Sequence, residues 1–86
     1  MCSNVNHDQL FEIIAKLTDF EDCKNFFLDL CSKSELDAMT QRLLSAKLLI
    51  KGETYENIIK ETGISSATLS RISKCVKQGK GYSKHL

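Results

Sequence analysis

The stretch GETYENIIKETGISSATLSRISKCVKQGKG, residues 52–81, decides the fold of this chain. Thr54 can cap a short helix, and Gly63 can form the turn that ends it. Ser65 or Ser66 can cap a second helix that follows directly. Two short helices joined at a glycine turn form the helix-turn-helix arrangement. The sequence therefore predicts this motif in the C-terminal half of the chain.

The second helix of the motif, residues 66–77, has an apolar side and a polar side. Leu69, Ile72 and Val76 recur at helical spacing, so we expect them to face the core. The residues of the polar side are small at first and basic further along: Ser66, Ala67, Ser70, Arg71, Lys74 and Lys77. Small side chains let a helix approach base edges in the major groove, and the cations after them can reach phosphates. The pattern favours DNA recognition, although the same residues also suit a plain solvated helix surface.

The charges of the chain are unevenly distributed around a formal net charge of +1. Residues 1–53 carry nine acidic and six basic side chains, and residues 54–86 carry two acidic and six basic ones. The first part therefore has a net charge of −3 and the second a net charge of +4. This asymmetry indicates a scaffold and a part that meets an anionic partner, with nucleic acid as the first candidate.

The sequence before the motif predicts three further helices with apolar stripes. The first begins at Asn6 or His7, the second is capped by Asp19, and the third starts at Ser34. The third helix is apolar on nearly every side and ends at Gly52, so we expect it to be central and to touch several neighbours. Because the 86 residues contain no proline, the fold class is predicted to be all-α, with five to six helices.

A chain of this length indicates one small domain, residues 1–86. Within it we expect a helical dimerisation scaffold over 6–51, the helix-turn-helix over 54–77 and a flexible basic tail over 78–86. Small chains bury a small fraction of their surface. We therefore expect a second copy of the chain to cover the apolar helix faces. The predicted assembly is a homodimer.

Several classes of protein do not fit the sequence. No run approaches the roughly 20 apolar residues that span a bilayer, and the N-terminus lacks the order of a signal peptide, so we expect a cytoplasmic protein with no membrane contact. No catalytic constellation or glycine-rich phosphate loop is present, and we expect neither enzymatic activity nor a cofactor. The cysteines and histidines show no metal-ligand spacing, so reduced, mostly buried thiols and no metal are expected; these residues are Cys2, Cys23, Cys31, Cys75, His7 and His85.

Three short motifs carry a resemblance to a known family. They are KGET at 51–54, ETG at 61–63 and ATLSR at 67–71. In these motifs the chain resembles the Trp repressor family, and more closely its YerC/YecD-like branch. The resemblance implies two intertwined chains whose DNA-reading heads are separated by about one turn of the duplex. The positions that it matches to base contacts are Ser66, Ala67, Thr68 and Ser70, with Lys77 near phosphate.

The chain also departs from that family, chiefly where the family binds tryptophan. The family holds the indole of its co-repressor between two arginines; Arg71 matches the second, whereas Leu44 is aligned with the first. Ile72 stands where the family has a glycine and would fill the cavity. Tryptophan is therefore not expected to bind, and Arg71 is expected to be a phosphate contact or a surface cation instead. In addition, Thr62 precedes the turn of the motif, where an apolar residue is more usual.

These observations predict a sequence-specific DNA-binding transcriptional regulator. We expect a homodimeric repressor that reads a two-fold symmetric operator on double-stranded DNA through the helix 66–77. The predicted contact residues are Ser66, Ala67, Thr68, Ser70, Arg71, Lys74 and Lys77. Two alternatives stay open, namely a helical protein-protein adaptor and a DNA-reading subunit of a larger transcription complex. A small-molecule effector cannot be named from the sequence.

Overall fold

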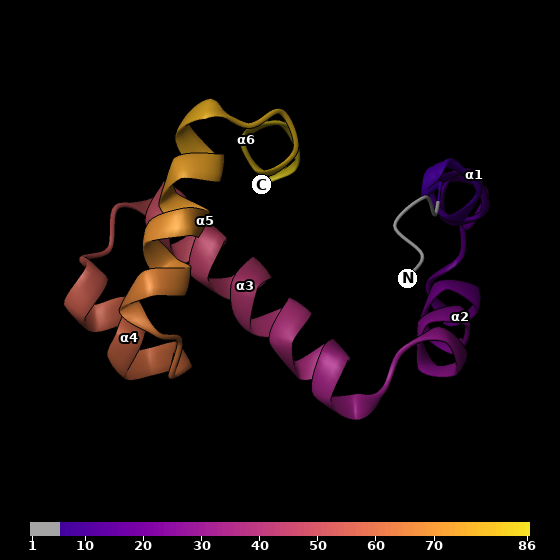
Figure 1. Cartoon of the computed structure of the whole chain (residues 1–86), viewed down its shortest axis with the longest axis horizontal. Helices are drawn as coiled ribbons and strands as arrows, with labels where there is room; N and C mark the ends of the chain where they lie inside the picture. Colours follow the sequence, from indigo (N-terminus) through magenta and orange to yellow (C-terminus); the bar gives the residue numbers. More distant parts are fainter. Residues whose placement is uncertain (1–5) are drawn as a thin grey trace. The chain divides into compact units, whose positions relative to one another are not determined.

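Residues 6–86, as described by this computed structural model, form six helices and no strand (Figure 1). In chain order the helices are α1 (Asp8–Ala15), α2 (Phe20–Leu30), α3 (Lys33–Lys51), α4 (Tyr55–Thr62), α5 (Ser66–Gln78) and α6 (Tyr82–His85). The predicted all-helical class is confirmed. The chain divides between Lys33 and Ser34 into two compact units.

The first unit contains α1 and α2, and each begins where a side chain accepts a main-chain N–H. Asn6 Oδ1 accepts from the N–H of Asp8 at 2.8 Å, just before α1. Asp19 caps α2 by accepting from the N–H of Asp22 at 3.2 Å, as predicted. Neither helix has a buried residue, and Phe20 is 76% exposed. The apolar stripes of these two helices are thus only partly covered within their own unit.

The second unit has a small core beneath the helix-turn-helix. The core residues are Ala46 from α3, Ile58 from α4, Ile64 from the turn, and Leu69 and Ile72 from α5. Partly buried apolar side chains, Val76 among them, pack against this cluster. The predicted inward side of the second motif helix is therefore confirmed. In Figure 1, α4 and α5 lie over the C-terminal end of α3.

Helix α3 buries less apolar surface than its sequence predicts. Only Ser45 and Ala46 of α3 are buried. Leu43 and Leu44 are each 45% exposed, and Ile50 is 43% exposed. The described part of the chain therefore covers one side of α3 and leaves apolar side chains on its other sides accessible.

The segment after α5 differs from the flexible tail expected over 78–86. Tyr82–His85 form the short helix α6, which contacts α5. Tyr82 is half-buried and packs against the core cluster. The basic residues of this segment suggested a free tail. The apolar contact of Tyr82 instead anchors it to the core.

The thiols of residues 6–86 are free, and they differ in how far they are buried. The free cysteines Cys23 and Cys31 are half-buried and Cys75 is exposed, so these thiols are more accessible than expected. Cys2 lies outside the described residues. Within the described range, no three His, Cys, Asp or Glu side chains are grouped so as to hold a metal ion. None of the helices in this range has the length and apolar character needed to cross a membrane.

Candidate nucleic-acid interface

The helix-turn-helix is formed by two capped helices and one left-handed glycine. Thr54 Oγ1 accepts from the N–H of Asn57 at 3.2 Å and caps α4. Gly63 follows α4 with φ of 75°, a conformation that glycine adopts without steric cost. Ser65 Oγ accepts from the N–H of Thr68 at 3.2 Å and caps α5. Ser65 is thus the cap of the second helix, and Ser66 is its first residue.

The unusual Thr62 before this turn is explained by its hydrogen bonds. Its hydroxyl donates to the carbonyl of Ile58 at 2.8 Å and accepts from the N–H of Ile64 at 3.2 Å. Its own carbonyl accepts from the side-chain amide of Gln41 at 2.8 Å. An apolar residue would fill the same place but would leave the N–H of Ile64 without this acceptor. Thr62 therefore holds the turn through polar contacts.

Helix α3 completes the support of the turn with a buried serine. Ser45 is 0% exposed, and its hydroxyl donates to the carbonyl of Gln41 at 2.8 Å. The same oxygen lies 3.4 Å from Thr62 Oγ1. A polar cluster of Gln41, Ser45 and Thr62 thus joins α3 to the turn. Reasoning from sequence missed Gln41 and Ser45, although a serine within the run of apolar residues Leu43, Leu44 and Ala46 was a signal that could have found Ser45.

The structure gathers the predicted contact residues on one side of α5. Six of them are exposed: Ser66, Ala67, Ser70, Arg71, Lys74 and Lys77. Thr68 is half-buried, and its hydroxyl accepts from Ser65 Oγ at 2.9 Å, so it is partly engaged in the helix cap. No acidic residue lies in the first turn of α5, and its last turn carries a lysine. This side, here called the reading face, therefore bears positive charge without an acidic neighbour on the same helix.

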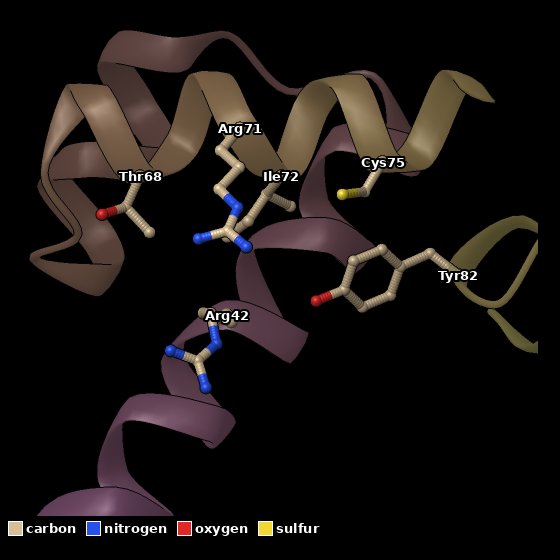
Figure 2. A pocket seen from close by; sticks show the side chains of 6 residues that line it. All are labelled: Arg42, Thr68, Arg71, Ile72, Cys75 and Tyr82. Carbon is tan, nitrogen blue, oxygen red and sulfur yellow. The ribbon is translucent and has the colours of Figure 1, made fainter. Parts of the chain in front are cut away.

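A pocket of about 460 Å³ lies beside the reading face (Figure 2). Its lining residues are Arg42, Thr68, Arg71, Ile72, Cys75 and Tyr82. In Figure 2, Arg71 extends from α5 toward α3, from which Arg42 arises, and the hydroxyl of Tyr82 points toward the space near the two arginines. The pocket thus combines two guanidinium groups with an aromatic ring and an aliphatic side chain.

This pocket corrects one inference from the sequence. The resemblance aligns Leu44 with the first of the two arginines that hold a ligand in the family, but Leu44 is absent from the lining of this pocket. Arg42 lines the pocket together with Arg71, whereas Leu44 does not. Residues two positions apart on a helix are separated by about 200° around its axis, so Arg42 and Leu44 point to different sides of α3. The other expected departure, Ile72, does line the pocket.

Fold and site together define a class of protein. A helix-turn-helix whose second helix exposes small residues followed by cations is the architecture of DNA-binding regulators. The sequence model of the family described as Trp repressor protein matches residues 5–86. The chain belongs to the Trp repressor family, a family of DNA-binding regulators.

Relatives in three bacteria agree with this assignment. The chain is 47% identical over 72 residues to the uncharacterised protein YerC of Bacillus subtilis (strain 168), covering 84% of this chain and 69% of YerC. It resembles the crystal structure of a candidate Trp repressor from Staphylococcus aureus, with a TM-score of 0.81 and 40% identity over 90% of this chain and 78% of the other. It also resembles the crystal structure of a TrpR-like protein from Eubacterium eligens ATCC 27750, with a TM-score of 0.82 and 37% identity over 90% and 80% of the two chains.

Proposed function

We propose that this protein is a homodimeric, sequence-specific transcriptional repressor that reads a two-fold symmetric operator. The reading face of α5 is the observation that carries the proposal, because it exposes small residues and then cations with no acidic side chain on the helix. Docked in the major groove, such a helix brings its N-terminal side chains to the base edges. Repression follows from occupation of the promoter.

The proposal assigns different tasks to the two ends of the reading face. Ser66, Ala67 and Ser70 are exposed and short, so they suit close contact with bases. Lys74 and Lys77 are exposed further along, where side chains of the helix meet the phosphate backbone. Thr68 faces DNA and also stabilises the first turn of α5 through its hydrogen bond with Ser65.

The homodimer is supported by the apolar side chains that the described residues leave exposed. On α1, α2 and α3 these are Phe11, Ile13, Phe20, Leu28, Leu30, Leu43, Leu44 and Ile50. Large apolar side chains exposed on each of the two units are candidates for burial against a partner. A second copy that covers them also supplies the second head that a two-fold symmetric site requires.

Tryptophan is not proposed as the effector. Arg42 restores a cationic wall to the pocket, so the case against tryptophan rests on Ile72 and Tyr82, whose side chains take up space in it. Arg71 borders both the pocket and the reading face, and we assign it to phosphate contact.

Selection of duplexes from a random DNA pool at near-physiological salt tests this function, with light scattering of the same sample to give its mass. We expect a two-fold symmetric site bound by a dimer. A helical adaptor would enrich no sequence, and a subunit of a larger complex would enrich a single unrepeated half-site. If no duplex is enriched, with or without added cell metabolites, the proposed function is wrong.

A further inference from the structure

Tyr82 is the first residue of the short helix α6, which packs against α5. It is half-buried, packs against the core that contains Ile72, and lines the pocket together with Arg42 and Arg71. Its hydroxyl is directed toward the space near the two arginines (Figure 2). An aromatic ring from the end of the chain therefore borders the pocket beside the reading face.

The path of the chain between α5 and α6 is built for this contact. At Gly79 a Cβ atom would lie 2.5 Å from the carbonyl oxygen of Cys75, closer than real Cβ atoms come to a backbone oxygen. The N–H of Gly79 donates to that same carbonyl at 2.7 Å. Only glycine lets the chain leave α5 this closely, and the return segment then carries Tyr82 onto the core.

Helix α6 depends on Tyr82 for its position. It has four residues, and a single turn of helix is not stable in water without tertiary contacts. The other residues of α6 are exposed. The contact between α6 and α5 therefore rests chiefly on the one aromatic side chain.

We propose that Tyr82 is a positioning residue that supplies the aromatic packing of the pocket from within the chain, so that α5 is held ready for DNA without a soluble ligand. This inference rests on the proposed function. Tyr82 acts on DNA binding through Ile72 and Arg71, which join the pocket to α5. Loss of the Tyr82 ring opens a space about the size of a phenol molecule. The C-terminal end of α5 can then move.

The test is chemical rescue of Tyr82→Ala with p-cresol, which has the shape of the deleted side chain. We expect Tyr82→Ala to bind the selected duplex about tenfold more weakly, a change of the size that one partly buried contact produces. Millimolar p-cresol should restore most of this affinity and should raise the Tm of the variant, while wild type should show neither response. Tyr82→Phe should bind DNA like wild type, because the ring carries the packing.

Two further variants make the test specific. Tyr55→Ala removes an exposed tyrosine outside the pocket, and p-cresol should change neither its affinity nor its Tm. Gly79→Ala displaces α6 while Tyr82 is retained, and it should weaken DNA binding to a similar extent. This second route also keeps the inference testable if Tyr82→Ala fails to fold.

The outcomes separate this inference from the proposed function. If the wild-type protein enriches no duplex, the proposed function is wrong. The effect of p-cresol on the Tm of Tyr82→Ala still tests the packing role in that case. Wild-type affinity in both Tyr82→Ala and Gly79→Ala overturns the inference alone. So does a weakened Tyr82→Ala variant whose affinity and Tm do not respond to p-cresol.

Discussion

The side-chain amide of Gln41 donates a 2.8 Å hydrogen bond to the main-chain carbonyl of Thr62, 21 residues further along the chain. This bond joins the middle of α3 to the last residue of α4. Ser45 lies next to the bond and is fully buried. The turn of the helix-turn-helix is therefore held by α3 as well as by its own two helices.

Replacing Gln41 with alanine should destabilise the second unit. The carbonyl of Thr62 loses its partner in a part-buried place, which costs about 1–2 kcal/mol. In a chain of this size each kcal/mol lowers the Tm by about 4–8 °C, so thermal unfolding followed by circular dichroism measures the effect. Gln78→Ala, at an exposed glutamine, is the control and should leave the Tm unchanged. Equal Tm values for the two variants would show that the bond carries no stability.

Gly63→Ala should be destabilising through backbone strain alone. Its φ of 75° disfavours a side chain, whereas the atom nearest to an added Cβ is Gln41 Nε2 at an ordinary 3.7 Å. The expected loss is about 1–2 kcal/mol in urea unfolding. Gly81→Ala is the matched control, because that glycine has a negative φ and no atom within 4 Å of the added Cβ. A Gly63→Ala variant as stable as Gly81→Ala would contradict this account of the turn.

The Lys74→Ala, Lys77→Ala double variant should bind every DNA sequence more weakly. Each phosphate contact contributes about 0.9 to the slope of log K against log salt, so the slope should fall by about two for each head. Fluorescence anisotropy over a salt series on specific and unspecific duplexes measures it. Lys24→Ala, an exposed lysine on α2, should leave the slope as it is. If the salt slope of the double variant is unchanged, the phosphate contacts lie on another surface of the protein.

The Ser66→Ala, Ser70→Ala variant provides the opposite signature. Loss of hydroxyls that contact bases should alter the selected sequence and leave the salt slope unchanged, because no charge is removed. Selection from the same random pool compares the two preferred sites. If wild type and variant select the same DNA sequence, these serines do not contact the bases.

The dimer should dissociate when charge is placed on the uncovered apolar side chains. Phe20 and Leu28 are 76% and 54% exposed, so Phe20→Asp with Leu28→Asp should cost little within one chain but should place carboxylates in the proposed interface. Light scattering should then report a monomer. Tyr55→Asp, on α4 of the DNA-reading motif, should stay dimeric. A dimer in both variants would place the interface elsewhere.

Local signals in the sequence predicted much of this fold. Caps at Asp19, Thr54 and Ser65 and the turn at Gly63 depend on neighbours a few residues away, so composition and spacing were sufficient. The exposed side of α5 followed from helical periodicity in the same way.

Contacts between distant residues were harder to predict. The bond from Gln41 to Thr62 and the packing of Tyr82 on the core join positions that no local pattern links. The pocket shows the same difficulty, because the sequence pointed to Leu44 at its α3 side, whereas the structure has Arg42 there. The sequence predicted the helix-turn-helix motif. It did not predict that Gln41 and Ser45 on α3 and Tyr82 on α6 support the motif.

The burial of Ser45 and Ala46 beneath α4 and α5 limits how DNA specificity can be exchanged between relatives. A chimaera that transplants residues 54–77 alone would set the new head on a foreign helix and lose the surface on which Ile58 and Leu69 pack. The unit that can be recombined as a whole begins at Ser34, where the chain divides. Recombination that exchanges this motif between relatives must therefore carry α3 along with it.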